Sequence, residues 1–427
     1  MRRIPVSQRT DQQVLDDLEG LDGGQLFRRL SEGGLVKLIS EIVEKEVNEH
    51  LGRGYYERRD LDEPHRGWRN GYREKGFSTS EGQVKVPIPR LRETKGLFES
   101  RLLSHLGRQT DRLERLVVEM YARGLSTRDI EALLKDDDGE VLLSKSSVSQ
   151  VTESLWAEYE AFAQADLSDY EVEYLWLDAV YEPIRRFMSR KEGIMAAWAV
   201  LRDGEKVLIG LDIGLRESAD SWASFIHDLI RRGLREPVLI VTEGNPGLLA
   251  AVTACFPGSW RQRCTFHKKR NVLEKIPEKA EEEINAWLNA IWGAPNLETG
   301  EKLAAEFIRT YQDRYPRAVA SFKDDLEASL THLRFPISHR RSIRTTNPIE
   351  RLFGEQRRRT KVIPRFFDEK SCLKLVFATL IRAAEGFRPF AISGLIVAQL
   401  EALRKERELP EKQSLDYQLA KQPRRAA

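Results

Sequence analysis

The sequence predicts an α/β core built on a mixed sheet, with an all-α insertion and a helical N-terminal region. Three observations predict it. Three apolar strands joined by short connections follow one another from Val172, as in an antiparallel meander. Helices and strands then alternate as far as residue 276. Residues 277–338 carry only amphipathic helical patterns, so an all-α unit is expected to interrupt the core there.

Within the core, hydrophobic periodicity predicts each element in turn. The five expected strands are 172–181, 193–201, 206–215, 237–243 and 260–264. The three expected helices are at about 219–232, 246–255 and 265–276. The resulting order, βββαβαβα, is that of a ribonuclease-H-like sheet, in which the first and fourth strands are expected to lie side by side.

The chain divides into seven segments of different composition. They are an N-terminal helical segment (1–51), an Arg- and aromatic-rich DNA-contacting segment (52–108), a helix-turn-helix-like DNA-binding domain (109–165), the first part of the core (170–276), the insertion (277–338), the last part of the core with a basic helix (339–404) and a flexible tail (405–427). In the second of these segments only QVKVPIPRL alternates like a strand.

Residues 109–165 have the outline of a helix-turn-helix. A helix is expected at about Arg112–Ala122, Ser126 is the expected N-cap of a second helix, and Ser144 that of a third. The third helix would contact DNA through its first turns. The residues concerned are Lys145, Ser146, Ser147 and Ser149. An ordinary three-helix bundle has the same outline, so the pattern alone leaves both interpretations open.

Bulk composition argues against a disulfide-rich or membrane protein. Of the 427 residues, 41% are hydrophobic and 32% are charged, as in globular chains with a core. The scattered cysteines Cys255, Cys264 and Cys372 argue against a disulfide framework and for a reducing cytoplasm. The N-terminus lacks a signal peptide and no apolar run could span a bilayer, so no membrane role is expected. The net charge of +2 by itself decides nothing about DNA binding.

Two carboxylates follow buried strands of the predicted core. Asp178 ends the apolar run Tyr174–Leu177, and Glu243 ends VLIVT in the same way. A carboxylate in such a place is costly unless it is paired, hydrogen-bonded or bound to metal. Because the two strands are expected to be neighbours, the two negative charges would repel each other, and a divalent cation resolves that conflict. Mg²⁺ prefers such oxygen ligands, and Mn²⁺ is expected to substitute for it.

A third carboxylate is expected from a later helix, and Glu350 in TTNPIERLFGEQRRRTK supplies it. Glu355 is the alternative, but it lies about 140° around the helix from Glu350, so both cannot face one site. The spacings are 65 (243 − 178) and 107 residues (350 − 243), and the second gap has room for the insertion. Any one acid alone is better explained as a cap or an ion-paired residue, whereas three beside an arginine cluster favour a catalytic site.

Residues 340–365 concentrate positive charge in a nearly neutral chain. They hold nine Arg and Lys against two Glu, a local excess of +7 (9 − 2). Because few acids are available as partners, these cations are expected to contact DNA phosphates, and a solvated charged helix is the alternative. The arginines concerned are Arg340, Arg341, Arg344, Arg351, Arg357, Arg358 and Arg359.

Cys264 and His267 have the spacing of half a zinc site. The sequence has no second pair with suitable spacing, so zinc is disfavoured and Cys264 is expected to pack in the core. His267 and the adjoining Lys268 are expected to face DNA, or His267 to orient one of the acids.

Several long motifs, in order, resemble the Mutator-like class of bacterial insertion-sequence transposases over about residues 30–400. The motifs are RNGYREKGFSTSEGQVKVPIPRLRETKGLFES, MYARGLSTRDIEALL, YLWLDAVY, VTEGNPGLLAAV, RQRCTFHKKRNV and TTNPIERLFGEQRRRTKVIPRF. The resemblance implies a ribonuclease-H-like fold with a helical insertion. It matches Asp178 to the family's first acid in the pattern LDA, and Glu350 to the third in the pattern N-x-x-E-R, which begins at Asn347. Cys264 and His267 match the family's Cys-x-x-His signature.

One position departs from the family pattern. The second acid of the family is normally an aspartate, in a pattern like T-D-G, and the residue here is Glu243. The extra methylene moves the carboxylate by roughly 1–1.5 Å, and an error of about 1 Å at a catalytic group can cost on the order of 10²-fold. Asp212 is a poor substitute, because its strand is expected at the edge of the sheet.

The function implied by the resemblance is DNA transposition by a two-metal mechanism with an Asp–Glu–Glu triad. Asp178 would bridge two Mg²⁺ ions, and Glu243 and Glu350 would each bind one. The expected partners are double-stranded DNA, as terminal inverted repeats and as target, and a second copy of the chain, because two DNA ends must be joined. Two alternatives stay open: a transposase-derived DNA-binding protein with impaired catalysis, and a ribonuclease-H-like nuclease that does not transpose.

Overall fold

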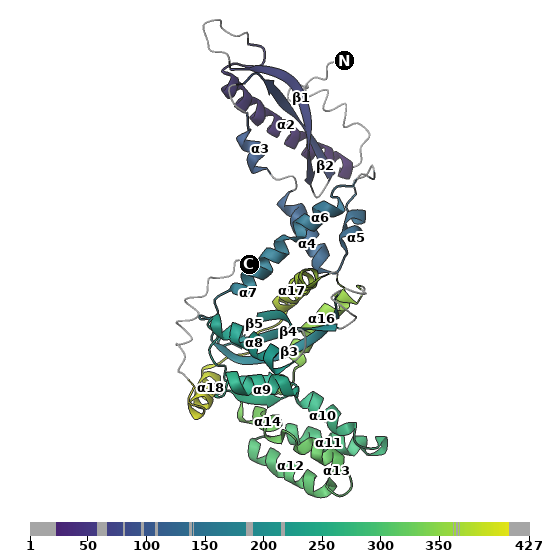
Figure 1. Cartoon of the computed structure of the whole chain (residues 1–427), viewed down its shortest axis with the longest axis vertical. Coiled ribbons are helices and arrows are strands. Elements are labelled where there is room, and N and C mark those ends of the chain that lie inside the picture. The colour runs from purple at the N-terminus through teal and green to yellow at the C-terminus, as the bar shows by residue number, and fades with distance from the viewer. Residues whose placement is uncertain are drawn as a thin grey trace. The chain divides into compact units, whose positions relative to one another are not determined.

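The structure is a computed structural model in which the chain forms two compact units, Met1–Ser154 and Leu155–Ala427, each considered by itself (Figure 1). The residues that it describes are 23–57, 66–79, 82–94, 98–106, 110–135, 139, 141–184, 191–214, 218–361, 363, 366 and 368–409. The segments predicted at 1–51, 52–108 and 405–427 therefore lie partly outside the described residues. Among the described helices, none combines the length and the apolar character needed to cross a membrane.

The first unit opens with a long helix packed on a β-hairpin. Its elements are α2 (Gly23–Leu51), β1 (Trp68–Thr79), β2 (Gly82–Arg92) and the short α3 (Arg101–His105). Strand β2 alternates buried and exposed residues, and its buried face packs against Val43 and Val47 of α2. Strand β1 was not predicted, because only two of its twelve residues are buried and these two are adjacent, which leaves no hydrophobic alternation to detect.

Three short helices complete the first unit, each started by the expected kind of cap. They are α4 (Asp111–Ala122), α5 (Thr127–Leu133) and α6 (Lys145–Thr152), with N-caps Thr110, Ser126 and Ser144. The Ser126 hydroxyl accepts from the backbone N–H of Asp129, whose carboxylate accepts in return, forming a capping box. A shared core of aliphatic side chains joins the three helices. The expected third helix is interrupted at Glu153, and α7 (Ser154–Gln164) follows as a separate helix.

A five-stranded mixed sheet forms the centre of the second unit. Its strands are β3 (Val172–Pro183), β4 (Lys191–Leu201), β5 (Lys206–Gly214), β6 (Leu239–Thr242) and β7 (Trp260–Arg263). Their order is β5-β4-β3-β6-β7, with the first three strands antiparallel and β6 and β7 parallel to β3. The predicted βββαβαβα order is confirmed, as are the central pairing of β3 with β6 and the edge position of β5.

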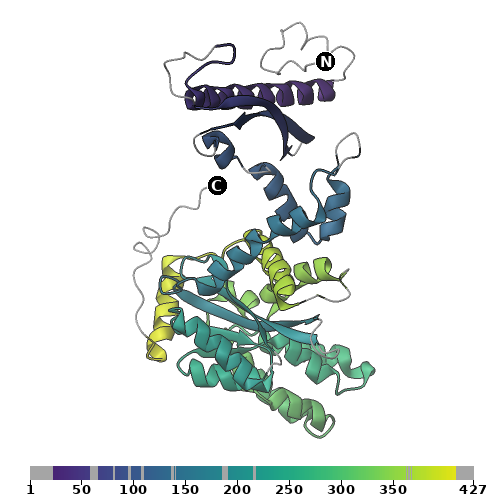
Figure 2. The same cartoon turned by 45° about the horizontal axis from the view of Figure 1, so that its top comes forward.

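Helices cover both faces of this sheet (Figure 2). One face packs against α8 (Ala219–Arg231) and α9 (Pro246–Cys255), and α16 (Asn347–Thr360) and α17 (Glu369–Glu385) lie on the other. Side chains of β3 alternate between the two faces. Leu175 and Leu177 join the core with α8 and α9. Trp176 faces the opposite side, where its indole N–H donates to the Thr345 carbonyl at 3.0 Å, and Asp178 shares that face.

The insertion is an all-α unit with a core of its own. After α10 (Thr265–Leu273) come η2 (Glu278–Ala280), α11 (Glu281–Trp292), α12 (Leu297–Tyr311), α13 (Pro316–Lys323), α14 (Leu326–Leu330) and η3 (Thr331–Arg334). Aromatic and aliphatic side chains from these helices bury one another, including Phe307 and Phe322. The short α15 (Ile337–Ile343) returns the chain to the sheet. Every residue from 277 to 338 is described and none lies in a strand, as predicted.

A helix that was not predicted, α18 (Gly394–Glu406), ends the described chain. Arg404 anchors it, because this side chain is only 2% exposed and pairs with the equally buried Glu173 at 3.7 Å. Leu409 is also buried. The expected flexible tail therefore begins too early: residues 405–409 belong to the folded unit, and residues 410–427 lie outside the described residues.

Candidate active site

The strand pairing puts Asp178 and Glu243 at neighbouring positions of the sheet. Strands β3 and β6 run parallel, and Leu177 of β3 is paired with Thr242 of β6. Asp178 directly follows Leu177 in the chain, and Glu243 directly follows Thr242. Asp178 is only 8% exposed, and its Oδ1 accepts a hydrogen bond from the Ala179 N–H at 2.8 Å. The predicted adjacency of the two strands is confirmed, but β3 continues to Pro183, so Asp178 lies within its strand and not at the end of it.

Glu350 reaches the same region from the first turn of α16. The Thr346 hydroxyl donates to Glu350 Oε1 at 2.7 Å and so limits the directions that this carboxylate can take. The N–H and the hydroxyl of Thr346 both lie 3.3 Å from the Cys264 sulfur, at the start of α10. A further bond, from the Thr265 N–H to the Arg344 carbonyl at 2.9 Å, ties the two segments together. The buried Cys264 thus joins α10 to α16.

His267 lies between the two glutamates. Its Nε2 is 3.0 Å from Glu243 Oε1 and 3.7 Å from Glu350 Oε1. One ligand atom from each of these three residues lies within 4.8 Å of the other two, a grouping that can hold a metal ion. Of the two roles considered for His267, the geometry favours orientation of the acids.

Asp178 is not a member of that three-residue group, but it lies within its electrostatic reach. Burial raises the pKa of Asp178 well above its ordinary value, and the charges of Glu243 and Glu350 raise it further. The Ala179 N–H and His267 act in the opposite direction. The cost of ionising Asp178 beside two other acids is the conflict that a divalent cation would relieve.

Cys264 and His267 shift the pKa of each other. Burial lowers the pKa of His267, but the Cys264 thiol and the carboxylates of Glu243 and Glu350 raise it, and the net shift is upward. Burial raises the pKa of Cys264, whereas hydrogen bonds from His267 and Thr346 lower it to a net decrease. Each partner therefore favours the charged form of the other, and Cys264 is buried as expected.

Arg263 is a buried cation beside the second acid that sequence reasoning missed. It is 6% exposed and ends β7, next to β6. Its guanidinium lies against Gly244 so closely that a Cβ at that position would overlap it. Burial lowers the pKa of Arg263, while acids that include Asp325 and Glu243 raise it. The small residue that follows Glu243 is the signal that could have pointed to a side chain packed there.

The arginines predicted to bind DNA have unequal surroundings. Arg341, Arg351 and Arg357 are exposed. Burial lowers the pKa of Lys206, and the charge of Arg351 lowers it further. Burial and then the charge of Arg341 lower the pKa of the half-buried Arg344, and burial and then the charge of Arg344 lower that of Lys269. Arg341, Arg344 and Lys269 form a group of neighbouring cations, which we call the basic cluster.

Four of the predicted DNA contacts meet protein groups instead. Arg340 donates to the carbonyls of Phe335 and Pro295 at 2.8 and 2.7 Å. Arg358 and Arg359 both pair with Glu355, one turn before them. The prediction that these arginines lack acidic partners is wrong for this pair, and Glu355 is turned toward them rather than toward the carboxylate group.

Lys268 is the fourth predicted DNA contact that meets protein groups. Its side chain is 1% exposed, and its ammonium lies 3.7 Å from Asp324. Burial lowers the pKa of Lys268 to about 8, with Asp324 opposing that shift. A side chain enclosed in this way cannot reach a DNA phosphate without rearrangement, so the structure does not place Lys268 as a DNA contact.

The remaining predicted residues lie on helix surfaces. Lys145, Ser146 and Ser149 are exposed along α6, whereas the Ser147 hydroxyl is 3.1 Å from that of the N-cap Ser144. Asn347 is exposed at the first position of α16. These positions are open to a ligand, and nothing in their contacts assigns one.

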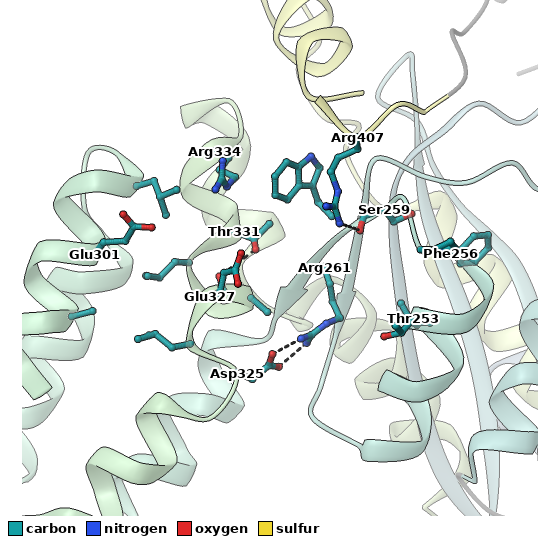
Figure 3. Close-up of a pocket in the computed structure, with 18 of the residues that line it drawn as sticks. Thr253, Phe256, Ser259, Arg261, Glu301, Asp325, Glu327, Thr331, Arg334 and Arg407 are labelled. Carbon is teal, nitrogen blue, oxygen red and sulfur yellow. Dashed lines mark hydrogen bonds and ion pairs between the residues drawn. The ribbon is translucent and has the colours of Figure 1, made fainter. Parts of the chain in front are cut away.

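A cavity of about 500 Å³ lies between the edge strand β7, helix α9 and the insertion (Figure 3). Arg261 makes two hydrogen bonds to the Asp325 carboxylate on its wall. Trp260 lies between two guanidinium groups there, with Arg334 and Arg407 at 4.7 and 4.6 Å from its ring. Asp178, Glu243, His267 and Glu350 do not line this cavity, so the cavity is separate from the candidate active site.

Comparison with known proteins identifies the family. Residues 10–389 match the model of the Mutator family of transposases. The chain is 31% identical over 352 residues to the transposase of insertion sequence ISRM5 from Rhizobium meliloti, covering 82% of this chain and 86% of that protein. It is 30% identical over 357 residues to the transposase of IS256 in transposon Tn4001 from Staphylococcus aureus, covering 82% and 89%.

Among solved structures, a Drosophila P element transposase strand transfer complex matches 73% of this chain and 81% of its own, at 13% identity and a TM-score of 0.29. That overlap is too low to establish a common fold. The sequence matches to the two insertion-sequence transposases, in contrast, extend over most of this chain and most of each relative. The chain therefore belongs to the Mutator family of transposases.

Proposed function

We propose that this chain is a DNA transposase that cleaves and joins DNA at the ends of an insertion sequence, with divalent cations held by Asp178, Glu243 and Glu350. The observation that carries the proposal is that one ligand atom each from Glu243, His267 and Glu350 lie within 4.8 Å of one another, with Asp178 on the strand β3 that pairs with β6. Membership of the transposase family supports the same reaction. We further propose that the mixed sheet, with its order β5-β4-β3-β6-β7, is a ribonuclease-H-like core.

The donor set fits a hard divalent cation. Two glutamates offer oxygen atoms close together, and Asp178 is a buried acid whose ionisation the other two oppose. Carboxylate oxygens with retained waters are the ligands that Mg²⁺ prefers, and Mn²⁺ accepts them too. When bound, such ions supply activation of the attacking hydroxyl and charge stabilisation at the leaving oxygen.

The protein side chains have distinct tasks in this proposal. Asp178, Glu243 and Glu350 provide the negative charge that holds the cations. His267 orients Glu243 through their 3.0 Å contact, and Thr346 orients Glu350 through its hydroxyl. Because these contacts exist in the protein before DNA arrives, little reorganisation is required when the substrate binds.

The cations near the carboxylates suit a phosphate backbone. The basic cluster of Arg341, Arg344 and Lys269 places like charges near one another, an arrangement that a bound polyanion would stabilise. We propose that it contacts DNA phosphates near the cleavage point, and that α5 and α6 contribute recognition of the terminal inverted repeats.

Two further expectations follow from the reaction. Joining two DNA ends in one event requires two active sites, so we propose that the chain works as a homodimer on double-stranded DNA. The relatives are transposases of insertion sequences from bacteria, which supports action on the bacterial nucleoid in the cytoplasm.

The test is cation-dependent strand cleavage of duplexes that carry the end of the element encoding this chain. We expect cleavage with Mg²⁺ or Mn²⁺, and a loss of at least about 10²-fold in Asp178→Asn. Asp212→Asn is the matched control, because it removes the same charge from the exposed residue at the edge strand β5. DNA binding without cleavage by the wild-type protein would favour the impaired DNA-binding protein. Nicking without strand-transfer products would favour a nuclease.

A further inference from the structure

An exposed aromatic side chain lies beside the carboxylates and has no task in the reaction proposed above. Phe266 follows the first residue of α10 and is 49% exposed. Its ring centroid is 5.5 Å from that of His267, in an edge-to-face arrangement. His267 Nε2 is in turn 3.0 Å from Glu243 Oε1. A large apolar ring is therefore open to solvent directly next to the most polar part of the molecule.

Basic side chains share the same face of α10. Lys269 and Arg270 come three and four residues after Phe266, spacings that bring side chains together on a helix. The Lys269 ammonium donates to the side-chain oxygens of Asn285 and Asn289 at 2.8 and 2.7 Å, which holds it near the start of the insertion. The Arg270 side chain is 60% exposed. This face, which we call the α10 face, thus combines one aromatic ring with two cations.

Exposure alone does not make Phe266 notable, because single exposed apolar residues are common on protein surfaces. Leu395 on α18 is more exposed, at 71%, and carries no functional implication. The difference lies in the neighbours of Phe266. Cations beside an aromatic ring are the combination by which proteins hold a nucleotide strand, and the carboxylates place this ring next to the proposed cleavage point.

We propose that Phe266 stacks on a nucleobase next to the phosphodiester that is cleaved, while Lys269 and Arg270 contact phosphates of the same strand. This inference rests on the proposed function, because it takes DNA as the substrate. Aromatic rings beside basic grooves hold single-stranded nucleotides without regard to base identity, so the stacked base must leave its pair at the cleavage point. A backbone phosphate at the carboxylates would bring its neighbouring base to Phe266. Stacking there would hold the scissile bond in line for attack.

The test uses 5-iodouracil, which crosslinks on irradiation to an aromatic ring stacked on it. Duplexes with the end of the element carry it at successive positions around the cleavage point, and Ca²⁺ replaces Mg²⁺ so that DNA binds without being cut. We expect crosslinking to the peptide that contains Phe266 from one position, loss of the crosslink in Phe266→Leu, and its retention in Phe266→Trp. Cleavage with Mg²⁺ should fall by about tenfold or more in Phe266→Leu, the effect of one lost base–aromatic stack. Phe266→Trp should stay within about threefold of the wild type, because it keeps the stack.

The control is Leu395→Ala, which removes an exposed apolar side chain from α18 and should change neither readout. A wild-type protein that cleaves DNA without crosslinking through Phe266 overturns this inference and leaves the proposed function intact. So does a Phe266→Leu variant that cleaves as fast as the wild type. Crosslinking through Phe266 by a protein that never cleaves supports the inference and overturns the catalytic proposal. A protein that does not bind the DNA overturns both.

Discussion

At the scale of single residues, the second acid is where this chain departs from its family. Glu243 stands where the family pattern has an aspartate, yet its carboxylate reaches His267 Nε2 at 3.0 Å and lies in one group with Glu350. The site therefore accommodates the longer glutamate side chain, because His267 lies within contact distance of its carboxylate. These contacts support the proposal that Glu243 is the second acid of the site.

Glu243→Asp tests that reasoning. Removing one methylene withdraws the carboxylate by roughly 1–1.5 Å and breaks the contact with His267, so we expect cation-dependent cleavage to fall by about 10- to 100-fold. Cleavage rates with Mg²⁺ and Mn²⁺ check it, with DNA affinity measured in parallel to show that the fold is intact. A faster Asp variant would show instead that glutamate impairs the enzyme.

Gly244, the residue after Glu243, is constrained by the packing around it. A Cβ on Gly244 would overlap the guanidinium of Arg263, which is buried and cannot withdraw freely. We expect Gly244→Ala to lower the free energy of unfolding by about 1–3 kcal/mol, as overpacking does, and to reduce cleavage by displacing Glu243.

The matched control is Gly354→Ala, in the interior of α16, where a Cβ meets nothing within 4 Å. There the same substitution should raise the free energy of unfolding by about 0.5–1 kcal/mol, because alanine favours the helix. Urea denaturation of both variants gives the comparison. Equal effects of the two substitutions would show that Arg263 does not constrain Gly244.

At the scale of elements, a buried histidine links the insertion to the sheet. His332 of η3 is fully buried; its Nε2–H donates to the Trp292 carbonyl at 2.9 Å, and its backbone N–H to Gln262 Oε1 of β7 at 2.6 Å. Burial lowers the pKa of His332 from 6.5 to about 4, with Arg344 and Arg340 adding to the decrease and the Trp292 carbonyl opposing it. The junction is therefore built around a neutral imidazole.

This junction should weaken in acid. Between pH 6.5 and 4 the unfolded chain takes up a proton at His332 that the folded chain refuses, so stability falls as pH falls. The loss grows by about 1.4 kcal/mol per pH unit, to roughly 3 kcal/mol near pH 4, and is absent above pH 7. Urea denaturation across this range should give a shallower pH dependence for His332→Gln, which keeps a donor but does not titrate. Identical pH dependences would rule out this source of acid sensitivity.

The elements also show which patterns a sequence can report. Apolar runs predicted all five strands of the central sheet, because buried strands must be apolar on both faces. Strand β1 has only two buried residues, adjacent to each other, and was missed for the same physical reason. Helix α18 was missed because buried ion pairs such as Arg404–Glu173 hold it, and charges at those positions read as a solvated surface.

At the scale of the whole molecule, the chain forms two units with a boundary between Ser154 and Leu155, at the beginning of α7. Helix α7 belongs with the sheet: Tyr159 donates to the Leu211 carbonyl at 3.1 Å and packs edge-on against Phe377. The proposed cleavage residues all lie in the second unit, and the helix-turn-helix-like helices in the first. The proposed function therefore places sequence recognition and cleavage in different units.

A fragment that begins at Glu153 should therefore fold without the first unit. We expect cooperative urea unfolding, and DNA binding that shows little sequence preference and weakens steeply with salt, as phosphate contacts do. Arg341→Ala in this fragment should reduce the slope of log affinity against log salt by about one. Fluorescence anisotropy with end and random duplexes provides the measurement. A fragment that still prefers the end sequence would place recognition in the second unit.

The sequence by itself determined the order of strands, the insertion, the placement of Asp178 and Glu243 on adjacent strands, and the family, because these depend on local periodicity and on motifs in order. Only the tertiary structure decided what each charged side chain meets. It enclosed Lys268, tied Arg340 to carbonyls and paired Arg358 and Arg359 with Glu355. It also brought His267 between two glutamates from distant segments. The partner of a charge depends on packing between elements far apart in the chain, and no local pattern records that distance.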